Sequence, residues 1–173
     1  MEEINQCWAS CIQKMMDEGK LGTKLQGGAA EHLVTCMSCP VCDGEKWQTY
    51  PDNHPAFDLS CLVCDSKFQI KASKGLEPSK NKKELIVLGT SYHIAKEHAG
   101  TIGFLLVSYR NNESIRKLYY VKANQVRAEH IYPFESLQKD GKPYTYCTIR
   151  FQKGTYKGLP ILPNNRKQNP VEK

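Results

Sequence analysis

The chain begins with apolar residues at helical spacing. Over residues 2–18 the apolar side chains recur every three or four positions, which places them on one face of a helix. Gly19 is a suitable end for this helix. The glycines over 20–28 predict a loop, and a short helix is expected over 29–35. The N-terminal part is therefore predicted to be a pair of helices joined by a loop.

Strand patterns dominate the later part of the chain. Residues 102–109 form a nearly continuous apolar run, which is typical of a buried central strand. Residues 117–122 predict a second strand, so we expect 102–122 to form a strand pair. Further strands are predicted over 68–71 and 144–151, a helix over 91–98, and either a strand or a helix over 85–88. Helices and strands together indicate a mixed α/β fold.

Length and composition suit a globular protein. The 173 residues are enough for one ordinary domain, which we expect over 1–163, followed by a polar, disordered tail over 164–173. The apolar runs are too short to cross a bilayer, and the first residues lack the pattern of a secretory signal. We therefore expect no membrane partner and a cytoplasmic location. The net charge of +6 suits a polyanionic partner if the charge is clustered.

Four of the eight cysteines stand in two Cys-x-x-Cys pairs. The pairs are Cys39 with Cys42 and Cys61 with Cys64. Zinc binds four thiolates tetrahedrally, and each such pair can supply two of them. In a chain without a signal peptide, this spacing favours metal binding over disulfides. We predict a structural zinc in a ribbon over about 36–66, with a closed thiolate shell that leaves no position for catalysis.

Other cysteines and one histidine leave alternatives to this ligand set. Cys36 also stands in Cys-x-x-Cys spacing and could replace one member of the first pair, although the Cys-Pro-x-Cys-Asp pattern favours the assignment above. His54 lies in the loop between the pairs and is a weaker candidate. Cys7, Cys11 and Cys147 fall on apolar faces and are expected in the core.

A group of polar residues surrounds the second cysteine pair. Gln69 and Lys71 point to one face of the predicted strand, and Asp58 falls on its partner strand across the turn. Asp58, the Gln69 side-chain oxygen and the Ile70 carbonyl could hold magnesium, which prefers oxygen ligands. Lys71 would orient or help deprotonate water and stabilise charge on a phosphate. This spacing also occurs by chance, so catalysis stays open at this point.

Lysines gather directly after this group. Over residues 67–83 they outnumber the single acidic residue. We assign nucleic-acid binding to Lys67, Lys74, Lys80, Lys82 and Lys83. The alternative is an ordinary solvated loop.

Residues 39–75 resemble the catalytic domains of DpnI-type restriction endonucleases, which belong to the PD-(D/E)xK nuclease superfamily. In that family a zinc ribbon is embedded in the core, and its second knuckle lies between a catalytic Asp and a Glu-x-Lys. The matching positions here are Asp58, Gln69 and Lys71. A fainter similarity covers 102–126.

The resemblance implies a fold, an activity and a partner. The implied fold is a restriction-endonuclease-like core, with a central mixed sheet flanked by helices and an embedded zinc ribbon. The implied function is magnesium-dependent cleavage of double-stranded DNA by a type II restriction endonuclease, leaving a 5′-phosphate and a 3′-hydroxyl. Methyl-directed recognition and a homodimer are left open.

Two departures from the family favour a second interpretation. Gln69 stands where the family has an acidic residue, and the winged-helix domain that reads DNA in the family does not follow residue 163. The alternative is therefore a non-catalytic zinc-ribbon module that binds nucleic acid through a degenerate site. A zinc-ribbon domain for protein interaction is a third interpretation.

Overall fold

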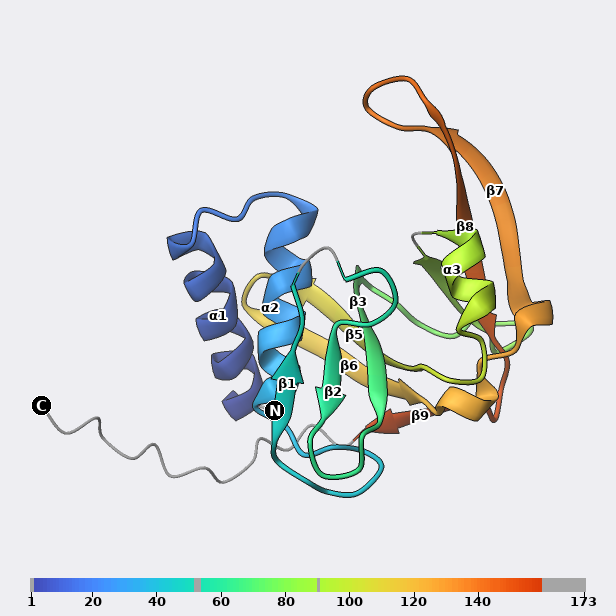
Figure 1. Cartoon of the computed structure of the whole chain (residues 1–173). Helices are drawn as coiled ribbons and strands as arrows, with labels where there is room; N and C mark the ends of the chain where they lie inside the picture. Colours follow the sequence, from blue (N-terminus) through green and yellow to red (C-terminus); the bar gives the residue numbers. More distant parts are fainter. Residues whose placement is uncertain (1, 52–53, 90, 160–173) are drawn as a thin grey trace, which may run out of the picture.

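The computed structural model describes residues 2–51, 54–89 and 91–159, in which two helices are followed by a region composed mainly of strands (Figure 1). The helices are α1 (Glu2–Asp17), α2 (Thr23–Thr35) and α3 (Tyr92–Glu97), with two short 3-10 helices, η1 (Ala123–Gln125) and η2 (Ala128–His130). The strands are β1 (Trp47–Thr49), β2 (Leu59–Cys61), β3 (Lys67–Lys74), β4 (Leu85–Gly89), β5 (Gly103–Asn111), β6 (Ser114–Val121), β7 (Ile131–Leu137), β8 (Pro143–Phe151) and β9 (Tyr156–Leu159).

Helix α1 confirms the helical pattern at the start of the chain. Its apolar face is buried, with Trp8 fully enclosed and Cys11 in the same row. The indole Nε1 of Trp8 donates a hydrogen bond to the Asn111 carbonyl at 2.9 Å, which ties α1 to the end of β5. Cys7 is half-buried at the edge of this cluster. The core position predicted for Cys11 is therefore confirmed, whereas Cys7 packs against the core from its edge.

Helix α2 begins earlier than the sequence predicts. The expected loop over 20–28 is wrong in its second half, because Gly27 and Gly28 lie inside the helix. A Cβ atom on Gly28 would lie only 2.7 Å from Met15 Sδ in α1. The glycine thus lets the two helices pack closely, and this packing outweighs the cost of about 1 kcal/mol for a helical glycine.

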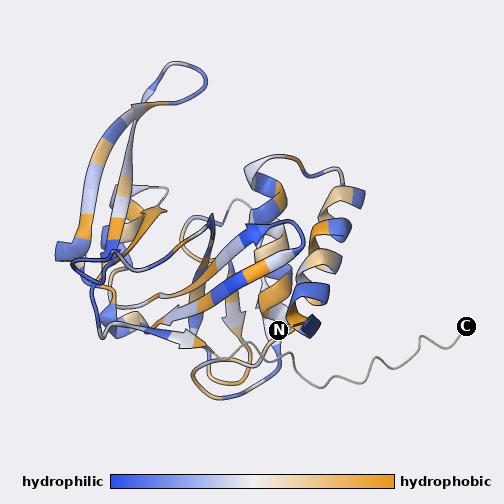
Figure 2. Cartoon of the chain, turned by 180° about the vertical axis from the view of Figure 1, so that it is seen from behind, coloured by the Kyte–Doolittle hydropathy of each residue, from blue (hydrophilic) through white to orange (hydrophobic). Residues whose placement is uncertain are grey.

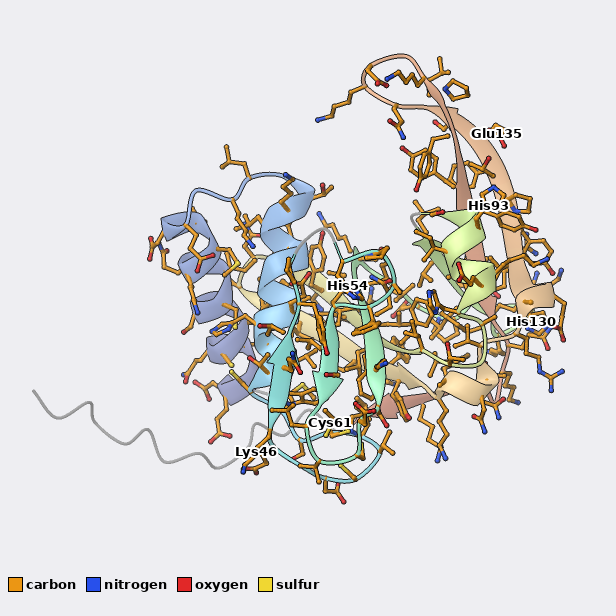
Figure 3. All side chains as sticks on the ribbon, viewed as in Figure 1. Lys46, His54, Cys61, His93, His130 and Glu135 are labelled. Carbon is orange, nitrogen blue, oxygen red and sulfur yellow. The ribbon has the colours of Figure 1, made fainter. Side chains whose placement is uncertain are left out.

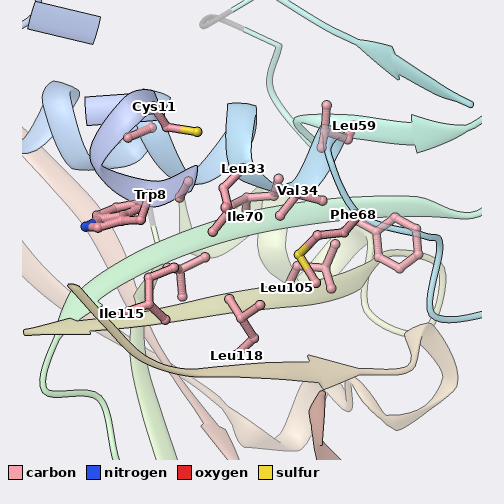
Figure 4. Close-up of a cluster of buried hydrophobic side chains, with 14 of the residues drawn as sticks. Trp8, Cys11, Leu33, Val34, Leu59, Phe68, Ile70, Leu105, Ile115 and Leu118 are labelled. Carbon is pink, nitrogen blue, oxygen red and sulfur yellow. The ribbon is translucent and has the colours of Figure 1, made fainter. Parts of the chain in front are cut away.

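The larger sheet has six strands in the order β1-β2-β3-β5-β6-β9. β3 and β5 run parallel, whereas the other neighbours are antiparallel, so the sheet is mixed. On β5, Leu105 and Val107 point to the cluster that α1 and α2 cover (Figure 4), while Phe104 and Leu106 point to the opposite face. Both faces of β5 are therefore buried, which explains its continuous apolar sequence.

The smaller sheet has three antiparallel strands in the order β4-β8-β7 and covers the opposite face of β5 and β6. Residues 85–88 are resolved as strand β4, in which buried and exposed residues alternate. The core position predicted for Cys147 in β8 is confirmed, because this residue is 0% exposed. The sequence analysis makes no prediction for β7, which contains Pro133; β7 is an edge strand, where a missing N–H group is tolerated.

These elements confirm the predicted mixed α/β fold with a central mixed sheet and helices. The proposed domain limits of 1–163 remain a prediction, and the predicted tail over 164–173 lies outside the described residues. Within the part of the chain that the structure describes, every helix is too short or too polar to cross a membrane.

Candidate functional site

Two turns of the same shape present the paired cysteines. In the first, the N–H of Asp43 donates to the carbonyl of Cys39 at 2.9 Å, and in the second the N–H of Asp65 donates to the carbonyl of Cys61 at 2.8 Å. Asp43 and Asp65 adopt left-handed backbone angles, with φ of 58° and 57°. Aspartate is one of the few residues that tolerate this conformation. The aspartate after each Cys-x-x-Cys pair therefore belongs to the turn that points the sulfur atoms toward one another.

The four sulfur atoms form a compact cluster. Cys39 Sγ lies 3.8 Å from Cys64 Sγ, and Cys42 Sγ lies 3.6 Å from Cys61 Sγ. All four sulfur atoms lie within 4.8 Å of one another. A tetrahedral zinc ion with bonds of about 2.3 Å would place its sulfur ligands about 3.8 Å apart. The cluster therefore fits the predicted zinc ion.

The thiols of the cluster differ in acidity. Burial raises the pKa of Cys39 above its usual range. Burial also acts to raise the pKa of Cys64, but hydrogen bonds with the hydroxyl and backbone of Ser66 outweigh it and bring the pKa down to about 7. Because zinc binds thiolates, ion binding must displace protons from the cluster, and zinc affinity will fall in acid.

The alternative ligands lie outside this cluster. The thiol of Cys36 donates a hydrogen bond to the carbonyl of His32 at 3.6 Å, near the end of α2. His54 Nδ1 accepts a hydrogen bond from the N–H of Phe57 at 3.3 Å. Figure 3 shows His54 and Cys61 at opposite ends of the short strand β2. The geometry therefore favours the original four-cysteine set.

Asp58 lies directly before β2, and its carboxylate turns toward β3. Its Oδ2 atom accepts a hydrogen bond of 2.6 Å from the N–H of Ile70 and one of 2.7 Å from Gln69 Nε2. The backbone N–H of Asp58 also donates a hydrogen bond to the Phe68 carbonyl at 2.9 Å. Both the backbone and the side chain of Asp58 are therefore bonded to β3. The structure thus brings Asp58, Gln69 and Ile70 together, as the hairpin spacing predicts.

Lys71 completes this group from the same face of β3. It is half-buried, and burial lowers its pKa, while the nearby Asp58 carboxylate acts in the opposite direction. Burial raises the pKa of Asp58, and the Ile70 N–H and the charge of Lys71 offset part of this effect. The two side chains therefore form a partly desolvated pair of opposite charges.

Both ionised groups oppose folding near neutral pH. The folded-state pKa of Asp58 is raised, so its contribution to stability is complete below about pH 3.8 and is lost as pH rises through the raised pKa. The folded-state pKa of Lys71 is lowered, so its contribution is complete above about pH 10.5 and is lost as pH falls through the lowered pKa. At neutral pH the fold therefore keeps two half-buried charges at a cost to its stability, which is common at functional sites.

A small cavity of about 30 Å³ lies beside Gln69 and Lys71. That volume is enough for one or two water molecules. Its other walls come from distant segments and include Pro55, Ala56, Gly89, Ile94, His98 and Ile149. The sequence analysis missed this side of the site, because only the tertiary fold brings β4, α3 and β8 next to β3.

The predicted DNA-binding lysines lie in three separate places. The ammonium group of Lys67, at the start of β3, lies 5.1 Å from the centre of the Phe57 ring, one residue before Asp58. Lys74 lies at the other end of β3. The connection between β3 and β4 carries the remaining three, Lys80, Lys82 and Lys83, all of them exposed. Only Lys67 therefore belongs to the immediate surroundings of Asp58.

The charge and number of the oxygen atoms at this site can be compared with the ligands that magnesium usually binds. Among Asp58, Gln69 and Ile70, only Asp58 carries a charge, and the amide nitrogen of Gln69 faces its Oδ2 atom. Magnesium commonly binds through one or two carboxylates and keeps several water ligands. The residues therefore fit an ion that is bound through Asp58 Oδ1 and largely through water.

Comparison with known proteins assigns the chain to a family. The family model described as DpnI, the Dam-replacing family, matches residues 20–165. This range includes both cysteine pairs and the segment from Asp58 to Lys71. A comparison with curated proteins gave no match.

Proposed function

Because the chain belongs to the Dam-replacing family of restriction-type nucleases, we propose that it is a magnesium-dependent type II endonuclease that cuts double-stranded DNA. The observation that supports this most strongly is the Asp58 carboxylate, fixed by Gln69 and Ile70, on the same face of β3 as the partly buried Lys71, which lines a cavity of water size. A module that only binds DNA gains nothing from holding a carboxylate and an ammonium group at a cost to stability.

The proposed roles follow from the contacts of each group. Asp58 holds the cation through Oδ1, while Ile70 and Gln69 fix its Oδ2 atom. A bound magnesium ion would supply positive charge to the phosphate and make the attacking water more acidic. Lys71 Nζ orients this water and takes its proton, and its lowered pKa makes the neutral amine more accessible than in an exposed lysine. The bond between phosphorus and the 3′ oxygen would break as the water attacks, and the leaving oxygen would take a proton from solvent, so that the products carry a 5′-phosphate and a 3′-hydroxyl.

We propose a structural role for zinc in this mechanism. Asp58 directly precedes β2 and Cys61 is its last residue, so one strand of three residues connects the carboxylate to the metal cluster. Zinc at the cluster would hold β2 against β3, and thereby hold Asp58 close to Lys71. Lys67 is the lysine best placed to contact a phosphate next to the cleavage site.

The competing function is DNA binding without cleavage, and one contact favours it. Gln69 Nε2 donates to Asp58, whereas an acidic residue at this position would repel that carboxylate and attract a cation. The site thus has less negative charge than one with two carboxylates, and weaker magnesium binding is the expected consequence.

Magnesium binding can be tested without any cleavage assay. We expect magnesium to raise the melting temperature of the zinc-loaded protein by several degrees, since an ion at about 100 times its Kd stabilises by about 2.7 kcal/mol. Asp58→Asn keeps an acceptor oxygen for Ile70 but removes the charged ligand, so its melting temperature should not respond. Gln69→Glu adds a carboxylate and should respond more strongly than the wild type. Equal responses of all three proteins in differential scanning calorimetry would exclude this magnesium site.

A further inference from the structure

A hollow at the β9 edge of the larger sheet carries three lysines. It has a volume of about 420 Å³ and lies at β6 and β9, next to the connection from β3 to β4. We call it the lysine hollow, and its lining includes Glu77, Lys83, Lys117, Tyr119, Lys153 and Tyr156. One lysine precedes β4, one belongs to β6 and one lies in the turn between β8 and β9. The tertiary fold thus brings together lysines from three distant segments.

The positive charges of the hollow have no negative partner. Lys83, Lys117 and Lys153 are exposed, and none of them forms an ion pair within the part of the chain that the structure describes. Glu77 is the one acidic residue of the lining, and its Oε1 atom lies 3.0 Å from Nη2 of Arg116, which balances its charge. Like charges that converge on one hollow oppose one another, and a bound anion would relieve this repulsion.

The backbone at Lys83 has a conformation that lysine rarely adopts. Its φ angle is 56°, and the left-handed region costs residues other than glycine about 1–2 kcal/mol. Its N–H donates to the Ser79 carbonyl at 2.9 Å, and its carbonyl accepts a hydrogen bond of 2.7 Å from the Tyr156 hydroxyl. A residue of the hollow therefore holds the loop that carries Lys83, and strained residues of this kind gather at functional sites.

Strand β6 supplies a lysine and a tyrosine to the same face. In the view of Figure 2 a hydrophilic segment interrupts β6, and the sequence of the strand assigns it to Arg116 and Lys117. Lys117 Nζ lies 5.5 Å from the centre of the Tyr119 ring. Gly158 of β9 lies opposite Tyr119, and a Cβ atom on this glycine would lie 2.8 Å from Lys117 Cε. The glycine thus leaves the space that the Lys117 side chain occupies.

Tyr119 brings a hydrogen-bond donor to the hollow. The residue is only 4% exposed, and its hydroxyl has no hydrogen-bond partner among the described residues. The hydroxyl is nevertheless accessible, because the fully enclosed side-chain atoms without a partner in this part of the chain are Ser108 Oγ and Arg150 Nε. Buried polar groups in proteins usually have a partner. An anion in the hollow would accept this missing hydrogen bond.

We propose that the lysine hollow binds a phosphate group and that the DNA backbone supplies it. The lysines provide positive charge and Tyr119 provides a donor, whereas a base has no ring on which to stack. The Tyr119 ring is buried and meets the Tyr156 ring edge-on at 5.8 Å. Phosphate contacts position a duplex without reading its sequence. The phosphate site stands on this geometry alone, while the choice of DNA as its source rests on the proposed function.

Strand register relates the hollow to the candidate active site. Lys71 of β3 pairs with Leu106 of β5, and Leu106 pairs with Tyr119 of β6. Lys71 and Tyr119 therefore lie in one row of the sheet and point to the same face. Neighbouring strands lie about 4.8 Å apart, so the two backbones are about 10 Å apart. Successive phosphates of one DNA strand advance by about 3.4 Å along the axis, so this separation corresponds to a few nucleotides.

Fluorescence anisotropy of the zinc-loaded protein with a short labelled duplex, without magnesium, tests the lysines. Lys117→Met and Lys153→Met each remove one charge but keep most of the side-chain length. Over about 50 to 200 mM salt, each should lower the slope of log affinity against log salt by about one unit. Lys157→Met is the matched control, because Lys157 is exposed on β9 but pairs with Tyr120 and points to the opposite face. Its slope should equal that of the wild type.

Tyr119→Phe separates the hydrogen bond from the charge. This variant loses only the hydroxyl group, so the ring still fills its place in the core. Duplex binding should weaken by about tenfold, the usual contribution of a hydrogen bond to a charged group, while the salt slope stays at the wild-type value. Circular dichroism checks that this variant and the lysine variants are folded.

Inorganic phosphate tests the other source of the ligand. Its effect on the melting temperature is measured without DNA, at constant ionic strength, for the wild type and for a protein that carries both Lys117→Met and Lys153→Met. A rise in the wild type alone, together with unchanged duplex slopes in the lysine variants, would show that the hollow takes a small phosphate ion rather than DNA.

Two results would overturn the phosphate site. The first is unchanged duplex slopes in both lysine variants together with equal responses to inorganic phosphate. The second is an equal loss of slope in Lys157→Met, which would show a general effect of net charge. Failure of the nuclease proposal is a different result, because it appears as absence of cleavage in magnesium and leaves slopes measured without magnesium unchanged.

Discussion

Replacing Lys71 with methionine is expected to reduce DNA cleavage by roughly 100- to 10,000-fold, the usual contribution of a positioned proton-transfer group. Methionine keeps most of the side-chain volume but removes the amine, whose charge interacts with that of Asp58. Duplex binding should change by less than about tenfold, because Lys71 is assigned to the transition state. Single-turnover cleavage and fluorescence anisotropy, measured on the same preparations, separate the two effects.

Lys74→Met is the matched control, because Lys74 lies on the same strand but is exposed at its end. Because Lys74 is also assigned to DNA binding, cleavage is compared with the protein in saturating excess over the duplex, where this variant should cleave at nearly the wild-type rate. The wild-type rate should also rise with pH toward the lowered pKa of Lys71, because the amine must be neutral to accept a proton. A Lys71→Met protein that cleaves as fast as the Lys74→Met protein would remove Lys71 from the mechanism.

Loss of zinc should have an equally large effect, although zinc takes no part in the chemistry. Structural zinc sites contribute on the order of 10 kcal/mol to folding, which exceeds the stability of many domains. Cys61→Ser should therefore give insoluble or unfolded protein, and a zinc-selective chelator should inactivate the wild type even with excess magnesium. Cleavage and near-ultraviolet circular dichroism should decline together, because a site loosened by about 1 Å can lose about a hundredfold in rate.

Cys36→Ser is the control for this experiment, because its thiol contacts the His32 carbonyl rather than the four-sulfur cluster. It should retain one zinc ion per chain by elemental analysis and remain folded. Zinc loss in Cys36→Ser would show that Cys36 is a zinc ligand. Full cleavage by demonstrably zinc-free protein would show that the active site does not depend on the zinc ribbon.

The sequence predicts those parts of the fold that depend on local patterns. The helical face of α1 and the apolar run of β5 follow from residue spacing alone. The start of α2 could not be predicted, because the reason for Gly28 is the approach of Met15 from another helix. The sequence analysis makes no prediction for β7, where the tolerance for Pro133 depends on its position at a sheet edge.

In the candidate site, too, the features set by local sequence could be predicted and those set by tertiary packing could not. The cysteine pairs and the position of Asp58 relative to Gln69 follow from a local hairpin, whose geometry is set by a few residues. The walls that Gly89 and His98 supply could not be predicted, because they depend on how the smaller sheet packs against the larger one. The separation of Lys67 from Lys74 reflects the length of β3, which the sequence analysis placed at 68–71.

The most direct test of the proposed function is incubation of zinc-loaded protein with supercoiled plasmid, both adenine-methylated and unmethylated, with and without magnesium. Our account predicts linear product with 5′-phosphate ends on at least one plasmid, only with magnesium, and none from Lys71→Met. Folded, zinc-loaded wild-type protein that binds these plasmids but leaves both intact in magnesium would contradict it and favour the non-catalytic DNA-binding module.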